Sequence, residues 1–226
     1  MADFQGFNPR TNEYLIGIRF NNHKEWFHEN KALYYENVHY PMVSLANEVY
    51  KKMHDMDNSF NELPKVSRAN RDIRFSKNKN PYKECKWFFL RGDGKPDIVY
   101  DKPTYFFELS PDWWRMGLFY APHPQKLAEY RKRIEADPSS LESLIDHYEA
   151  IKAMFPMEAD MYKRKFSTEL SEKLLKWYSI KAVDFTCYGT YQNKTRTDKM
   201  VYSPELTDFI FDGFKKLYPL YKYFNF

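Results

Sequence analysis

Apolar side chains recur every three or four residues along much of the chain, which is the spacing that places them on one face of an α-helix. At the N-terminus this spacing follows Asn8-Pro9, a typical helix start. The pattern predicts further helices that begin at Asn22, near Met42, after Pro124, at Asp137-Pro138, at Thr168 and at Ser203-Pro204. Pro41 and Pro219 are expected to end the helices that precede them, because proline cannot donate the helical hydrogen bond.

Other stretches alternate apolar and polar residues or are rich in aromatic side chains, as β-strands are. Strands are predicted at residues 72–76, Cys85–Leu90, Ile98–Leu109, Met116–Ala121 and 180–191. Successive strands joined by turn residues indicate an antiparallel arrangement. The sequence therefore predicts a single α+β domain over residues 1–226, with a central antiparallel sheet, helices packed against it, a helical N-terminus and a C-terminal helix.

The composition, 43% hydrophobic and 29% charged, is that of a globular protein and not of a disordered one. The start MADFQGF lacks the basic and apolar regions of a signal peptide. No apolar run approaches the roughly 20 residues that a membrane span needs. Cys85 and Cys187 are the two cysteines, too few for a disulfide framework. These features predict a cytoplasmic protein with no membrane partner and with two reduced, buried thiols.

Positive charge is concentrated in one stretch, residues 67–83, with the sequence SRANRDIRFSKNKNPYK. This basic segment carries a formal +5, whereas the whole chain carries +4. Its one acidic residue is Asp72, and its cations are Arg68, Arg71, Arg74, Lys77, Lys79 and Lys83. A cluster of this kind indicates an anionic partner, because arginine presents a planar fork to phosphate or carboxylate and lysine a compact charge.

On the predicted strand 72–76, Asp72, Arg74 and Ser76 share one face, while Ile73 and Phe75 share the other. Arg74 and Ser76 would then offer a cationic fork beside a hydroxyl, with Asp72 holding the arginine. This arrangement outlines an anion site for a phosphate, a nucleotide or a nucleic acid. The alternative is a structural network of ion pairs that joins the basic segment to acidic helices, and the residue types alone leave both open.

Motifs for other chemistry are missing from the sequence. There is no glycine-rich fingerprint for a nucleotide or dinucleotide and no GxSxG elbow. The six histidines show no metal-ligand spacing, although ligands from distant segments can still converge. We therefore expect no cofactor and no metal from motifs, and the oligomeric state is not predicted. Trp113-Trp114 is expected to provide core packing and one partly exposed ring, with base stacking as the alternative.

Four stretches together resemble a known family, domain of unknown function 2461. They are NNHKEWFHENKALY at 21–34, RANRDIRFSKNKNPYK at 68–83, YFFELSPDWWRMGLFYAPHP at 105–124 with the LAEYRKRI that follows it at 127–134, and SPELTDFIFDGFKKLYPLYKYF at 203–224. The resemblance implies a single α+β domain found widely in bacteria, with no established activity to carry over. The matching positions are Asn21, Asn22, Trp26, Phe27, Arg68, Arg71, Asp72, Arg74, Phe75, Ser76, Lys79, Pro81, Tyr82, Lys83, Gly117, Pro122 and Arg131.

These observations favour a protein that binds or processes an anionic small molecule, bearing phosphate or carboxylate, at motif 68–83; whether it is an enzyme stays open. Asp72, as a general base or arginine partner, and Tyr82, as a hydrogen-bond donor, are the candidate catalytic residues. The expected ligand-binding residues are Asn21, Asn22, Arg68, Arg71, Arg74, Ser76, Lys79 and Lys83, with the two asparagines at a helix N-terminus. A nucleic-acid-binding module and a purely structural ion network are the alternatives.

Overall fold

The structure is a computed structural model that describes residues 3–92, 101–163, 166, 168–191 and 195–226. The chain forms two compact units, and each is described by itself. The first unit comprises residues 1–92, 106–116 and 188–212, and the second comprises residues 93–105, 117–187 and 213–226. The organisation as one domain stays a prediction.

Six strands form an antiparallel sheet in the order β1-β2-β3-β4-β6-β5. The strands are β1 (Lys65–Val66), β2 (Lys86–Leu90), β3 (Thr104–Leu109), β4 (Trp113–Tyr120), β5 (Met157–Met161) and β6 (Ile180–Thr190). Lys65 pairs with Phe89 at one edge, and Met157 pairs with Phe185 at the other. The predicted α+β class with an antiparallel sheet is confirmed.

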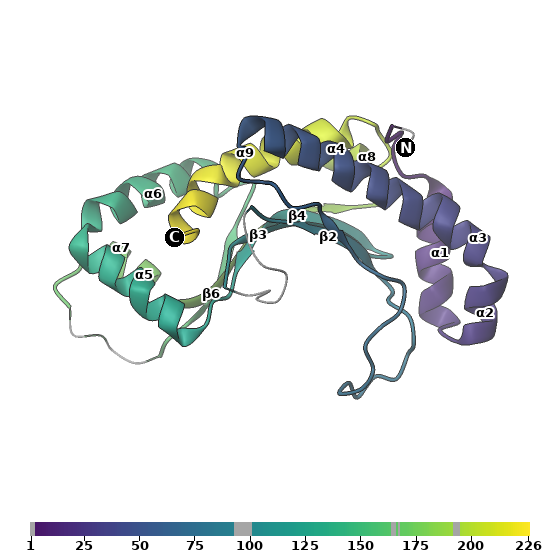
Figure 1. Ribbon diagram of the computed structural model, residues 1–226, viewed down its shortest axis with the longest axis horizontal. Helices are drawn as coiled ribbons and strands as arrows, with labels where there is room; N and C mark the ends of the chain where they lie inside the picture. Colours follow the sequence, from purple (N-terminus) through teal and green to yellow (C-terminus); the bar gives the residue numbers. More distant parts are fainter. Residues whose placement is uncertain (1–2, 93–100, 164–165, 167, 192–194) are drawn as a thin grey trace. The chain divides into compact units, whose positions relative to one another are not determined.

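Helices precede, interrupt and follow the strands (Figure 1). They are α1 (Pro9–Phe20), α2 (Lys24–Glu29), α3 (Lys31–Tyr34), the π-helix η1 (Tyr35–His39), α4 (Tyr40–Met56), α5 (Pro124–Ala136), α6 (Pro138–Ile151), α7 (Glu172–Tyr178), α8 (Arg196–Met200) and α9 (Leu206–Phe224). Among the described residues, none of these helices has both the length and the apolar character needed to cross a bilayer.

In the first unit, helix α4 packs on strands β1 and β2 and runs across them (Figure 1). Its inward stripe contains Leu45, Val49 and Met53, all fully buried. From β2, Phe88 and Leu90 point to the same core because alternate residues of a strand share a face. Burial of such a stripe stabilises a helix more than its intrinsic propensity does.

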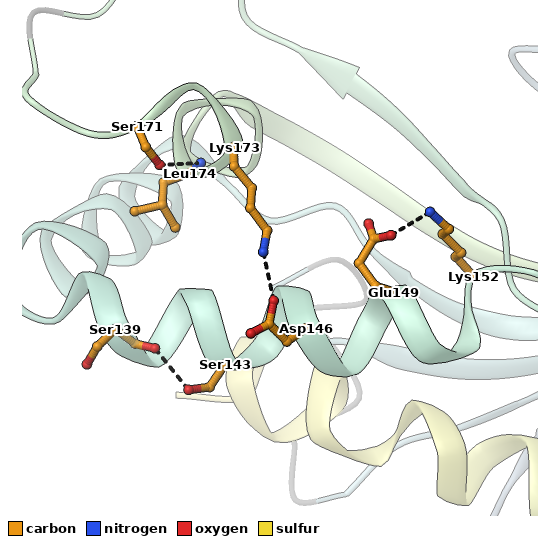
Figure 2. A network of polar contacts seen from close by, with 8 residues as sticks. All are labelled: Ser139, Ser143, Asp146, Glu149, Lys152, Ser171, Lys173 and Leu174. Atoms are coloured by element: carbon orange, nitrogen blue, oxygen red, sulfur yellow. Dashed lines mark hydrogen bonds and ion pairs between the residues drawn. The ribbon is translucent and has the colours of Figure 1, made fainter.

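In the second unit, α6 packs against α5 and α7. Figure 2 shows the outer side of this group, where Lys173 of α7 reaches Asp146 of α6 at 2.7 Å. The Ser171 side chain caps α7 by accepting a hydrogen bond from the backbone N–H of Leu174. Because the ion pair is exposed, it contributes little stability, and the buried apolar stripe of α6 fixes the packing.

Pro41 does not break the N-terminal helical run as predicted, because α4 begins at Tyr40 and follows directly on η1. A proline removes the donor that would serve the carbonyl four residues earlier, here that of Asn37. The buried hydroxyl of Thr11 in α1 donates to this carbonyl at 2.7 Å. In η1 the N–H of Tyr40 instead reaches the carbonyl of Tyr35, the wider spacing of a π-helix. Tertiary contact and local geometry thus accommodate the proline.

Pro219 also lies inside a helix, since α9 continues to Phe224. Leu217, Leu220 and Tyr221, which flank it, are fully buried. Their packing compensates for the one helical hydrogen bond that the proline removes. The prediction that Pro219 ends this helix is therefore wrong.

The strand predicted at residues 72–76 is wrong as well. The structure has a loop there, and Phe75, expected to face inward, is 95% exposed. The helix predicted from Thr168 begins later, at Glu172. Residues 98–100 of the strand predicted at Ile98–Leu109 lie outside the described residues, and β3 covers its second half.

The Thr11 hydrogen bond yields a testable prediction. Thr11→Val keeps the shape of the side chain but leaves the buried Asn37 carbonyl without that donor. We expect the free energy of unfolding in urea to fall by about 1–3 kcal/mol. In a Pro41→Ala background the new N–H restores a donor, so the same substitution should cost less. Equal costs in both backgrounds would contradict this role for Thr11.

Candidate functional site

The basic segment forms a long loop that projects beyond β1 and β2, shown in blue-green in Figure 1. Its base is a short antiparallel ladder that continues from those two strands. The N–H of Arg71 donates to the Pro81 carbonyl and the N–H of Lys83 donates to the Ala69 carbonyl, each at 2.8 Å. Asn70 and Tyr82 form the bridge between these bonds. The two arms are therefore fixed in register.

A bulge interrupts this ladder beside the sheet. The N–H of Ser67 donates to the Trp87 carbonyl, and the next bond along the ladder joins Lys83 to Ala69. Between these two bonds the first arm runs two residues, from 67 to 69, while the second runs four, from 83 to 87. The longer arm contains Glu84 and Cys85. Bulges re-aim side chains and are common beside functional sites. Here the bulge turns two polar groups, a carboxylate and a thiol, toward a cavity described below.

Asn22 fixes the C-terminal arm of the basic segment, at Tyr82, to the N-terminal helices. Its side chain accepts a hydrogen bond from the Tyr82 N–H and donates one to the Tyr82 carbonyl, both at 3.0 Å. The cap of α2 is His23, so Asn22 does not start that helix as predicted. Asn21 caps the C-terminus of α1, and its amide donates to the Gly17 carbonyl. Neither asparagine is the N-terminal cap of a helix.

Within the basic loop, three cations contact protein groups. Arg74 grips Asp72 with two side-chain hydrogen bonds of 3.0 and 2.7 Å, and Arg74 lowers the pKa of the Asp72 carboxyl to about 2. Lys79 donates to the Ile73 carbonyl at 3.0 Å. Lys83 donates to two carbonyls of the opposite arm, which fastens the base of the loop. The expected contact between Asp72 and Arg74 forms, although in a loop.

A cavity of about 500 Å³ lies beside the loop, within the first unit. Its cationic lining residues are Arg71, Lys83 and Arg19. Arg19 is neutralised, since it pairs with Glu84 at 3.4 Å and Asp112 at 2.8 Å. In the described part of the chain, no carboxylate pairs with Arg71. Burial lowers the pKa of Lys83, and the nearby charges of Arg68 and Arg71 lower it further.

Glu108 and Cys85 also line the cavity. Arg115 holds Glu108 by a hydrogen bond from its Nε and an ion-pair contact from a terminal guanidinium nitrogen, each 2.8 Å from the same carboxylate oxygen. Burial, together with the charge of Glu108 and a hydrogen bond to it, raises the pKa of the Cys85 thiol to about 12. The thiol is therefore protonated at neutral pH and is not an activated nucleophile. It is half-buried, so the expectation of two buried thiols holds for Cys187 alone.

Close to this cavity, Lys86 is buried with 2% of its surface exposed. Its ammonium donates to the Tyr34 hydroxyl at 2.9 Å and to the Ser67 carbonyl, and it lies 2.9 Å from His39 Nδ1. Burial lowers its pKa to about 8, helped by the charge of Lys83. Burial and the charge of Lys86 in turn lower the pKa of His39, so the imidazole is a neutral acceptor.

Of the predicted ligand-binding residues, Arg71 and Lys83 line the cavity. The others, Asn21, Asn22, Arg68, Arg74, Ser76 and Lys79, are not among its lining residues, and neither are the predicted catalytic residues Asp72 and Tyr82. Tyr82 is buried and stacks on Phe27 at 4.1 Å. Their roles toward a ligand stay predictions.

Sequence reasoning missed the polar cluster around Lys86. The signal was a lysine at an inward position of a strand, in phase with Phe88 and Leu90. The residues that come to the cavity from α1 and β3 have no such signal. In the described ranges, no group of three or more histidine, cysteine, aspartate or glutamate side chains is placed to hold a metal ion.

Comparison with known proteins finds one family. Residues 10–223 match the model of a family described as "Conserved hypothetical protein (DUF2461)". Curated proteins were also compared, and none matches the chain.

The two hydrogen bonds between the Asn22 side chain and the Tyr82 main chain lead to a prediction about stability. Asn22→Ala removes both side-chain hydrogen bonds to the Tyr82 main chain, and the free energy of unfolding should fall by about 1–3 kcal/mol. Asn80→Ala is the control, because this neighbouring side chain makes no hydrogen bond to another described residue. Urea unfolding measures both. Equally small losses in Asn22→Ala and Asn80→Ala would show that the hydrogen bonds of Asn22 to Tyr82 contribute no stability.

Lys86 predicts a pH dependence. Its pKa is about 8 in the folded protein, below the usual value near 10.4, so between these values the unfolded chain binds more protons. The contribution of Lys86 to stability therefore increases as the pH rises through this window and is lost as the pH falls through 8. From pH 7 to 10, wild type should gain roughly 2–3 kcal/mol relative to Lys86→Met.

Urea unfolding at both pH values measures this gain, and the comparison cancels the tyrosines and cysteines that both proteins share. Lys51→Met, on the exposed side of α4, serves as the matched control and should follow wild type. Parallel pH profiles for wild type and Lys86→Met would rule out the assigned pKa.

Proposed function

Since the chain belongs to this family of conserved hypothetical proteins, whose description names no activity, we propose a function from its own residues: it binds a small molecule bearing a phosphate or carboxylate in the cavity beside the basic loop. The observation that carries the proposal is Arg71, a guanidinium that lines the cavity without a carboxylate partner among the described residues. A charged group in this position favours an oppositely charged ligand.

The electrostatics around Arg71 support the same proposal. The positive charges of Arg68 and Arg71 lie close enough to Lys83 to disfavour its charged form. The neighbouring carboxylate of Glu84 is paired with Arg19. An anion between Arg71 and Lys83 would relieve this repulsion, and Arg71 could bind it with two parallel hydrogen bonds. Lys83 would contribute charge while its protons stay on loop carbonyls.

The proposal is one of binding, and turnover is not part of it. Asp72 has a pKa of about 2 because Arg74 holds its carboxylate, which makes it a weak base at neutral pH. The Tyr82 ring is buried against Phe27. General-base action by Asp72 and proton donation by Tyr82 thus remain the sequence-based hypothesis.

A thermal-shift series tests the proposal. Wild type is titrated with inorganic phosphate, sugar phosphates, nucleotides, carboxylates and short oligonucleotides. A ligand at one hundred times its Kd adds about 2.7 kcal/mol of stability, and each kcal/mol raises Tm by roughly 2–4 °C in a protein of this size. Arg71→Ala should remove the shift and remain folded.

Arg74→Ala is the matched control, because this arginine lies in the same loop, is 76% exposed at its side chain and pairs with Asp72. The sequence predicts Arg74 as a ligand-binding residue, but Arg74 does not line the cavity, so a site in the cavity requires this variant to keep the shift produced by the small anion. Loss of the shift in Arg74→Ala but not in Arg71→Ala would place the site outside the cavity. A response to oligonucleotides alone, falling steeply with salt, would favour the nucleic-acid-binding alternative.

A further inference from the structure

Resting on the proposed function, we propose that the ligand carries an aromatic ring beside its anionic group, and that this ring stacks on the indoles that line the cavity. Trp87 and Trp113 both border the cavity that Arg71 and Lys83 make positive. Nucleoside monophosphates and aromatic carboxylates share this chemistry. An anionic group alone would use only the cationic lining residues of the cavity.

The indole of Trp87 is positioned by a neighbouring ring and is the first candidate to stack on a ligand. It lies in β2 and is only half-buried, although most of the large aromatic residues of this strand and its neighbours are core. Its ring stacks on Phe89 with centroids 4.2 Å apart and 19° between the planes. Phe89 therefore supports one face of the indole, and a planar ligand ring can extend the stack in the offset geometry that aromatic rings prefer.

The indole of Trp113 is held in place by two neighbouring side chains. The Arg115 guanidinium lies 5.3 Å from its ring centroid, and the Tyr188 ring meets it edge-on at 6.4 Å. Arg115 is itself fixed by Glu108. Trp114, the next residue, is fully buried in the core, so the half-buried ring of Trp113 is the one available to a ligand. An indole fixed in this way loses little conformational entropy when a ring binds.

The size and lining of the cavity agree with a ligand larger than a bare anion. About 500 Å³ is within the range of small-molecule sites and exceeds what a bare anion needs. Ser110 also lines it, and its hydroxyl makes no hydrogen bond to another described residue. The cavity lining thus combines cationic side chains, two indoles and a hydroxyl, which suit an anionic group, a ring and a polar substituent.

Isothermal titration tests the inference with ligand pairs that differ in the ring. Adenosine monophosphate is compared with ribose 5-phosphate, and indole-3-acetate with acetate. The ring-bearing member of at least one pair should bind wild type about tenfold or more tightly, which corresponds to about 1.4 kcal/mol. The pair that shows the preference distinguishes a phosphate from a carboxylate ligand.

Trp87→Leu and Trp113→Leu should reduce the ring preference to less than about threefold in at least one variant, with ring-free binding unchanged. The corresponding Trp→Phe variant keeps a ring and should retain most of the preference, which separates stacking from a folding defect. Phe75→Leu is the control, because this ring is 95% exposed on the same basic loop and does not line the cavity.

Each contrary outcome is distinct. Equal affinity for ring-bearing and ring-free anions would overturn the ring inference and leave the proposed function standing. A preference lost in Phe75→Leu but kept in both tryptophan variants would place the ring on the loop and overturn the cavity assignment. No binding by any of the four ligands to wild type would overturn both proposals.

Discussion

A buried ammonium is the constraint on which the first unit depends most. Lys86 lies in the core side of β2, and a charge in that position must find acceptors or lose its proton. It finds three neutral ones, from Tyr34 of α3, His39 of the π-helix and the main chain of Ser67. One side chain therefore ties the helical layer to the strand and to the residue where the basic segment begins.

The basic segment that starts there divides into two groups of cations. Arg74, Lys79 and Lys83 bind groups of the loop itself, and they give it a defined shape. Arg71 borders the cavity without a carboxylate from the described chain. The structural alternative weighed for the sequence was a set of ion pairs to acidic helices, whereas the ion pair seen for these cations in the described residues is Arg74–Asp72, within the loop itself. The anion site at Arg71 stays a proposal.

Two positions on which the resemblance to the family rests, Gly117 and Arg131, have an architectural reason in this structure. A Cβ on Gly117 would lie 2.1 Å from the carbonyl oxygen of Phe185, a distance no side chain tolerates. Arg131 is buried, donates to the carbonyl of Tyr178 and lies over the ring of Tyr162 at 4.6 Å. Such contacts join segments far apart in sequence, so a pattern within one segment does not reveal them.

The sequence predicted an element correctly where the spacing of its apolar residues matches the side chains that are buried in the structure. The stripe of α4 does so and was predictable, whereas in β2 the aromatic residues predicted a strand but not which face is buried, since Lys86 points inward and Trp87 outward. The alternation at residues 72–76 does not match burial, because this segment has no sheet beside it and Phe75 is exposed. Strand β5 was missed since its residues Met157–Met161 include two acids and are only partly buried. The cavity could not be predicted because a bulge and separate elements build it.

The ladder at the base of the basic loop has a consequence for the tolerance of the chain to change. The backbone hydrogen bonds of Arg71 and Lys83 and the Lys83 ammonium hold the two arms together below the tip, and Asn22 ties one arm to the N-terminal helices. Closing a longer loop over a fixed base costs only about 0.6 kcal/mol for each doubling of its length. Within the basic loop, residues 72–80 are therefore expected to accept an inserted peptide or a backbone cut while the remainder of the first unit stays assembled.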